Sequence, residues 1–185
     1  LNEGDKIGII GINGTGKSSL LRVLAGQQVP DQGTVSLDPN VQVCFLPQNP
    51  AMVEGATVLE QVFLHFPAEF RELNEYEAKA MLNRLGITDF AQKVGTLSGG
   101  QRKRVALAAA LIHPADVLIL DEPTSGLSPD LDRSMMELCR KLSHENCTVL
   151  MVTHNMSNIN LCDKIAFLGT GGVLCYYCLL YTSDA

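Results

Sequence analysis

A glycine-rich stretch near the start of the sequence constrains the fold more than any other feature. It reads GINGTGKSS, residues 11–19, and it follows directly on the apolar run KIGII. Four of its residues satisfy the phosphate-loop pattern G-x-x-x-x-G-K-[ST], namely Gly11, Gly16, Lys17 and Ser18. The stretch lies between an expected strand at 6–11 and an expected helix at 17–26, which is the context that such a loop requires.

Each residue type in this loop has a chemical reason. Glycines let the backbone turn its N–H groups inward around phosphate oxygens, and the start of the helix adds partial positive charge. The Lys17 ammonium can reach the β and γ phosphates, and the Ser18 hydroxyl can bind Mg²⁺. We therefore expect the phosphate-binding residues to be Gly11, Asn13, Gly14, Thr15, Gly16, Lys17, Ser18 and Ser19.

A second apolar run ends in two carboxylates. The stretch VLILDE, residues 117–122, predicts a buried strand with Asp121 and Glu122 at its end. Asp121 is expected to hold Mg²⁺ through water. Glu122, as a second carboxylate directly after the metal-holding one, can polarise a water molecule for in-line attack on a γ-phosphate.

The remaining pattern predicts an α/β fold. With 185 residues and 46% hydrophobic content, the chain can bury the core of one domain. Apolar strands, each followed by a helix, favour a mostly parallel sheet covered by helices on both faces. The expected strands are 6–11, 33–38, 41–47, 117–121, 148–154, 164–169 and 173–177, and the expected helices outside the lobe described next are 17–26, 99–112 and 129–143.

One region departs from this alternation. From Thr57 to Phe90 the apolar residues recur at helical spacing, in two runs that Pro67 separates. We expect a small helical lobe, inserted at about residues 55–100.

Charge and composition exclude some classes of protein. A net charge of −6 argues against a broad basic face for nucleic acid, and the basic cluster at 101–104 is short enough to be a solvated helix face. The six cysteines are scattered through expected strands and helices, so we expect reduced thiols. No apolar run approaches the roughly 18 residues of a spanning helix. We expect a cytoplasmic protein without direct membrane insertion, or one held at the cytoplasmic face of a membrane by a partner.

Five motifs, in order along the chain, resemble those of the ATPase domain of the ABC superfamily. They are GINGTGKS, Gln48 in FLPQ, LSGGQ at 97–101, LILDEP at 118–123 and His154 in VTHN. The resemblance spans about residues 1–177 and implies a P-loop NTPase that uses ATP and Mg²⁺. It also implies a second ABC ATPase domain as partner, in a homodimer or heterodimer that clamps two ATP molecules head to tail.

The resemblance assigns roles to the remaining candidate residues. Ser98, Gly99, Gly100 and Gln101 open a helix and would bind the γ-phosphate of an ATP held by the other subunit. Gln48 would reach Mg²⁺ and the attacking water while linking the site to the helical lobe. His154 would contact the γ-phosphate as a switch histidine. The catalytic set is therefore Glu122, His154 and Gln48, and the metal set is Ser18, Gln48 and Asp121.

The sequence departs from the family pattern in three places. Members usually carry two or three strands before this start, including an aromatic residue that stacks on adenine, so we expect a truncated N-terminal β subdomain. Ser128, in SGLS, stands where the family usually has the aspartate that helps to couple the two sites. Residues 178–185 match no part of the pattern and resemble translated sequencing adapter.

Two biological roles remain open. The stretch from Leu97 to Thr124 and the short span from Gln48 to Leu97 resemble the soluble ABC-F class, which acts on the ribosome. The sequence after Thr124 resembles the ATP-binding subunit of a membrane transporter, whose helical lobe grips a membrane-spanning partner. A hybrid reading frame with its change near Thr124 would explain both resemblances.

Overall fold

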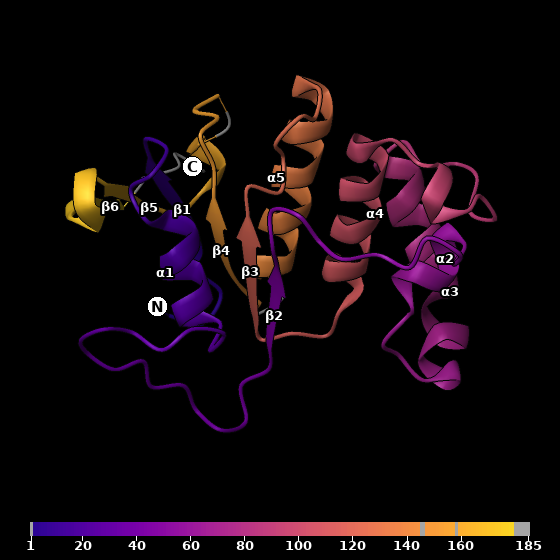
Figure 1. The fold of residues 1–185 in the computed structure, drawn as a ribbon, viewed down its shortest axis with the longest axis horizontal. Coiled ribbons are helices and arrows are strands. Elements are labelled where there is room, and N and C mark those ends of the chain that lie inside the picture. Colours follow the sequence, from indigo (N-terminus) through magenta and orange to yellow (C-terminus); the bar gives the residue numbers. More distant parts are fainter. Residues whose placement is uncertain (1, 145–146, 158, 180–185) are drawn as a thin grey trace.

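The computed structural model describes residues 2–144, 147–157 and 159–179. Its centre is a six-stranded sheet in the order β2-β3-β4-β1-β5-β6 (Figure 1). The first five strands in this order run parallel, and β6 pairs antiparallel with β5 at the edge. The strands are β1 (Lys6–Gly11), β2 (Val43–Leu46), β3 (Val117–Asp121), β4 (Thr148–Val152), β5 (Lys164–Leu168) and β6 (Leu174–Leu179).

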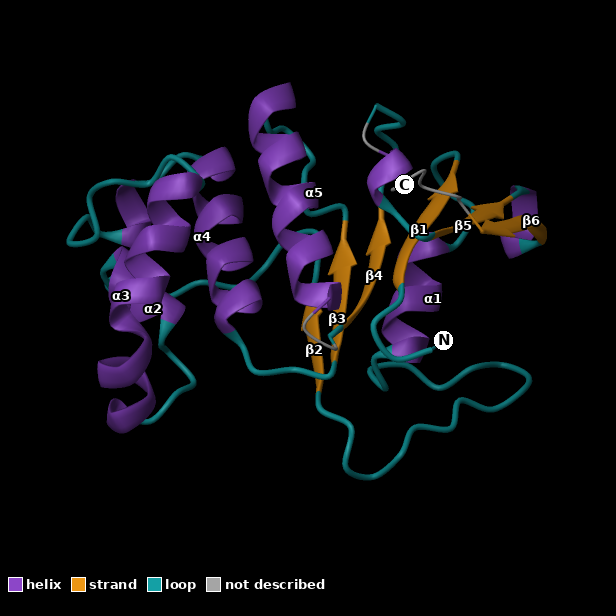
Figure 2. Cartoon of the chain, turned by 180° about the vertical axis from the view of Figure 1, so that it is seen from behind, coloured by secondary structure: helices purple, strands orange, loops and turns teal. Residues whose placement is uncertain are grey.

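Helices cover both faces of this sheet, as the apolar strands predict. On one face α1 (Lys17–Leu24) buries Leu21 against Ile9, Ile119 and Leu150. The opposite face carries α4 (Gly99–Ile112) and α5 (Pro129–His144), which lie to the left of β3 and β4 in Figure 2. The expected α/β class with a mostly parallel, helix-covered sheet is confirmed.

A buried lysine joins α5 to the sheet. Lys6 begins β1 and is fully buried, and its Nζ donates to the carbonyl oxygen of Met136 in α5 at 2.6 Å. Burial lowers the pKa of Lys6 below its usual value, because the charged form loses its hydration. The hydrogen bond to a helix carbonyl offsets part of that cost.

The expected helical lobe consists of α2 (Val58–Val62) and α3 (Ala68–Arg84), which pack against α4. Thr57 caps α2 in a capping box with Glu60, and Pro67 is the N-cap of α3. The lobe shares one apolar core with the sheet face that α4 and α5 cover. Helix α4 therefore lies between the lobe and the sheet and contacts both.

The prediction of a strand at 33–38 is wrong, since this segment forms an irregular loop between α1 and β2. The alternation GTVSLD favours a strand only if a neighbouring strand accepts and donates the ladder hydrogen bonds. The described structure places no such strand beside it. Val35 and Leu37 remain 39% and 47% exposed, so the alternation has no core to face.

The C-terminal hairpin extends slightly further than expected. Strand β6 runs to Leu179, so Cys178 and Leu179, the first two residues of the expected tail, pair with β5. Residues 180–185 of that tail lie outside the described residues.

The six cysteines are free thiols. In the described ranges no helix has both the length and the apolar character that crossing a membrane would require.

Candidate functional site

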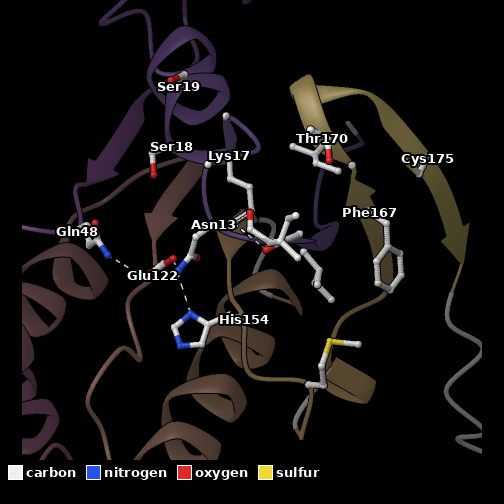
Figure 3. A pocket seen from close by; sticks show the side chains of 18 residues that line it. Asn13, Lys17, Ser18, Ser19, Gln48, Glu122, His154, Phe167, Thr170 and Cys175 are labelled. Atoms are coloured by element: carbon white, nitrogen blue, oxygen red, sulfur yellow. Dashed lines mark hydrogen bonds and ion pairs between the residues drawn. The ribbon is translucent and has the colours of Figure 1, made fainter.

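A cleft with a volume of about 1210 Å³ lies at the carboxyl ends of the parallel strands. In open parallel sheets this edge is where ligands bind. The cleft brings together the phosphate loop, Gln48, Glu122 and His154, which come from four separate parts of the chain (Figure 3). Of the expected phosphate-binding residues, its lining includes Gly11, Asn13, Gly14, Gly16, Lys17, Ser18 and Ser19.

The phosphate loop depends on glycine at two positions. Gly14 and Gly16 have φ angles of 84° and 86°, in the left-handed region that other residues rarely adopt. Lys17 is buried, and its Nζ donates to the carbonyl oxygens of Gly11 at 2.7 Å and Ile12 at 2.9 Å. The lysine ammonium therefore lies inside the curve of the loop, where a bound phosphate would meet it.

Thr15 and Gly11 help to fix the conformation and position of the loop. The Thr15 side chain is buried and its hydroxyl donates to the Ile12 carbonyl at 2.9 Å, so a contact of Thr15 with phosphate would come from its backbone N–H. A Cβ on Gly11 would overlap the carbonyl oxygen of Leu168 in β5. The loop is thus packed against the β5–β6 hairpin and is not a free surface turn.

Ser18 and Asp121 place two oxygen donors side by side at the base of the loop. The Ser18 Oγ donates to Asp121 Oδ1 at 3.0 Å. Burial raises the pKa of Asp121, and the Ser18 hydrogen bond and the charges of Arg22 and Lys17 oppose that rise. A hydroxyl and a carboxylate so close together are the hard oxygen donors that Mg²⁺ prefers, so the donor set fits this metal.

Glu122 lies between the other two expected catalytic residues (Figure 3). Gln48 Nε2 donates to Glu122 Oε2 at 2.8 Å, and His154 Nδ1 lies 3.7 Å from Glu122 Oε1. Glu122 has a φ angle of 50°, which costs about 1–3 kcal/mol for a residue other than glycine. Among the described residues it alone has positive φ without being glycine. Backbone strain of this kind gathers at functional positions.

The LSGGQ residues lie apart from the cleft. Ser98 is the N-cap of α4, where its Oγ accepts from the Gln101 N–H at 3.3 Å and the Gln101 side chain accepts from the Ser98 N–H at 2.9 Å. The first N–H groups of a helix have no acceptor within it, which leaves those of Gly99 and Gly100 for another group. No residue from 98 to 101 lines the cleft. Thr15 and Asp121 do not line the cleft either, but Thr15 belongs to the phosphate loop and Asp121 is hydrogen-bonded to Ser18, so residues 98–101 are the expected set that lies apart.

One wall of the cleft is formed by residues that lie outside the five sequence motifs. The β5–β6 hairpin contributes Phe167, Thr170 and Cys175 on the side of the loop away from Glu122 (Figure 3). The Phe167 ring meets that of Tyr176 edge-on, with centroids 6.0 Å apart. The apolar strand KIAFLG gives no sign of this role, because the wall exists only through the pairing of β5 with β1.

The comparisons with known proteins agree with this geometry. A family model described as ABC transporter matches residues 1–125. YfmR of Bacillus subtilis, an uncharacterized ABC transporter ATP-binding protein, is 36% identical over 95% of this chain. The aliphatic sulfonates import ATP-binding protein SsuB of Cupriavidus pinatubonensis is 37% identical over 92% of it. The chain spans 34% of YfmR and 58% of SsuB.

A solved structure agrees over nearly the whole chain. The dimeric ATP-binding cassette MJ0796, in a post-hydrolysis state bound to ADP and Pi, has a TM-score of 0.83 at 27% identity. The match covers 98% of this chain and 88% of that one. The family model and the two relatives, together with the phosphate loop and the carboxylates around the cleft, show that the chain belongs to the ABC transporter family, as an ATP-binding domain of that family.

Proposed function

We propose that this domain binds ATP with Mg²⁺ and hydrolyses it as the nucleotide-binding part of an ABC transporter, in a head-to-tail dimer. The observation that carries the proposal is Glu122, a carboxylate held in the cleft by Gln48 and close to His154. It follows directly on Asp121, which pairs with Ser18 of the phosphate loop. A base, a metal-ligand pair and a phosphate loop thus share one edge of the sheet.

The phosphate loop supports binding of the triphosphate. In the structure Lys17 satisfies its charge with the carbonyl oxygens of Gly11 and Ile12. A bound phosphate offers the ammonium a charged acceptor, and such hydrogen bonds are about twice as strong as those to neutral groups. Binding then exchanges weaker contacts of Lys17 for stronger ones, without a change in the fold.

The residues around Glu122 support hydrolysis. As general base, Glu122 takes a proton from a water molecule while the water oxygen attacks the γ-phosphorus and the bond to the leaving ADP oxygen breaks. Gln48, bonded to the same carboxylate, positions the water, and His154 contacts the γ-phosphate from the other side. Ser18, Asp121 and Gln48 would hold Mg²⁺, which would supply positive charge to neutralise the triphosphate.

The separation of the LSGGQ residues from the cleft supports a dimer. A γ-phosphate in the cleft of one chain would be closed off by Ser98, Gly99 and Gly100 at the start of α4 in the other chain. Specific ATPase activity should therefore rise with protein concentration below the dimer dissociation constant, measured as phosphate release over about two decades of concentration. Activity per chain that is independent of dilution would contradict the dimer.

A mixing experiment provides the control for the dimer. Lys17→Ala breaks the phosphate loop, and Gly100→Asp places a negative charge where the partner's γ-phosphate would bind. Each variant alone should be inactive, because both composite sites of its dimer are broken. A mixed dimer contains one complete site, so the mixture should regain single-turnover hydrolysis. If the mixture stays as inactive as its components, the two motifs do not meet across chains.

We propose a membrane-spanning transporter subunit as the further partner, at the cytoplasmic face, gripped by the helical lobe of α2 and α3. The ABC-F resemblance of residues 97–124 keeps the ribosome as the second candidate. Co-sedimentation of the Glu122→Gln variant with ribosomes, measured with and without MgATP, distinguishes between these two candidate partners. Co-sedimentation that depends on ATP would favour the ribosome and contradict the transporter proposal.

A further inference from the structure

A hydrogen bond outside the five motifs connects two segments of the site. Asn155 Nδ2 donates to Asp132 Oδ2 at 2.6 Å, a contact between residues 23 positions apart. Asp132 lies in the first turn of α5 and is only 3% exposed, whereas its neighbour Asp130 in the same turn is exposed. Asn155 directly follows His154. The bond therefore ties the start of α5 to the loop that carries the histidine.

Asn155 is held by more than this bond. Its Oδ1 accepts from the Ser157 N–H at 3.0 Å, and its own N–H donates to Thr153 Oγ1 at 3.1 Å. Thr153 is buried and its N–H donates to the Ile9 carbonyl of β1 at 3.1 Å. The backbone of His154 is thus anchored on one side to the sheet and on the other side, through Asn155, to α5.

The histidine side chain itself has little else to fix it. It is 58% exposed, and its distance of 3.7 Å from Glu122 is longer than a hydrogen bond. The other partner of the Asn155 bond, Asp132, also donates its backbone N–H to the Ser128 carbonyl at 2.9 Å. Ser128 is the last residue of the segment 123–128, which connects Glu122 to α5. The bond between Asp132 and Asn155 therefore links the segment after the base to the segment that carries the histidine.

We propose that Asp132 and Asn155 are positioning residues for ATP hydrolysis, which hold His154 at the γ-phosphate side of the cleft. The proposal rests on the proposed ATPase function. An acidic residue in the first turn of a helix also interacts favourably with the helix dipole, but that interaction is available to the exposed Asp130 as well. The helix dipole alone explains neither the burial of Asp132 nor its charge-assisted hydrogen bond with Asn155, the residue after His154.

The test is the exchange of the two polar groups. Asn155→Asp places a second carboxyl group 2.6 Å from that of Asp132, where two negative charges repel. We expect it to lower kcat by about 10- to 100-fold, the loss that a shift of about 1 Å can cause in a reacting group. The dissociation constant for ATP should stay within about twofold, because the phosphate loop is untouched. The double variant Asp132→Asn with Asn155→Asp restores an amide–carboxylate pair and should recover most of kcat.

Two further variants keep the test decisive. Asp130→Asn removes the same charge from the same helical turn at an exposed position and should leave kcat unchanged. Thermal unfolding shows whether Asn155→Asp is folded. If it is not, Asn155→Ala removes the hydrogen bond to Asp132 without adding a negative charge. It should show the same fall in kcat at constant ATP affinity.

The outcomes separate this proposal from the proposed function. A wild-type chain that binds ATP but does not hydrolyse it at any concentration contradicts the ATPase function itself. An active wild type with unchanged kcat in Asn155→Asp and Asn155→Ala overturns the positioning role. So does a double variant that remains as slow as Asn155→Asp, since a purely local packing defect would not be repaired by restoring the pair.

Discussion

Replacing Glu122 with glutamine is expected to lower ATP turnover by about 10²- to 10⁴-fold, the range that a general base contributes. The amide fills the same space and can keep a hydrogen bond with Gln48, which lies 2.8 Å from the carboxylate in the structure. It cannot accept the proton of the attacking water. ATP and Mg²⁺ binding should stay intact, because Lys17, Ser18 and Asp121 are unchanged.

The same variant should trap the ATP-bound dimer. A ligand that binds only the dimer stabilises it by mass action, and without hydrolysis the step that opens the dimer is lost. Light scattering of Glu122→Gln with and without MgATP measures this directly. As the matched control, Glu72→Gln changes an exposed glutamate of α3 and should neither slow turnover nor accumulate dimer. A Glu122→Gln chain that stays monomeric with ATP bound would contradict the head-to-tail dimer.

Lys17→Ala should reduce ATP affinity by about 2–4 kcal/mol, or roughly 30- to 1000-fold, measured by calorimetric titration. The substitution removes the Lys17 ammonium, which lies inside the curve of the phosphate loop and donates to the carbonyl oxygens of Gly11 and Ile12. Truncating one side of such a charged contact costs this much because the phosphate charge is left without its partner.

Loss of order in the loop is the competing explanation for such a result. Thr15→Ala removes the hydroxyl that also bonds the Ile12 carbonyl, and it does so without removing a charge. It should therefore weaken ATP binding much less than Lys17→Ala. Equal losses in the two variants would show that Lys17 acts by ordering the loop, and unchanged affinity in Lys17→Ala would refute its role in binding.

The motifs and most elements could be predicted from the sequence because they depend on local patterns. Strand β1 and helix α4 begin and end where their apolar runs and cap residues place them, at Lys6–Gly11 and Gly99–Ile112. The phosphate loop and the Asp121–Glu122 pair are equally local, since their chemistry depends on residue types at a fixed spacing.

Other features depend on partners that a local pattern does not contain. Lys6 reads as the polar start of a strand, yet it is fully buried because α5 covers it and offers the Met136 carbonyl. The alternation at 33–38 reads as a strand, yet it forms none, because the described sheet places no strand beside it. In both cases the environment supplied by distant segments decides the outcome.

The sequence by itself determined the family and the phosphate-loop motif, and it predicts Glu122 as the base, because these features depend on contiguous residues at a fixed spacing. Only the tertiary structure decided how they meet. The strand order brings Gln48 and His154 to either side of Glu122, whose positive φ is maintained by the surrounding fold. The bond from Asn155 to Asp132 likewise joins segments whose closeness arises from the packing of α5 on β4, which residue spacing does not encode.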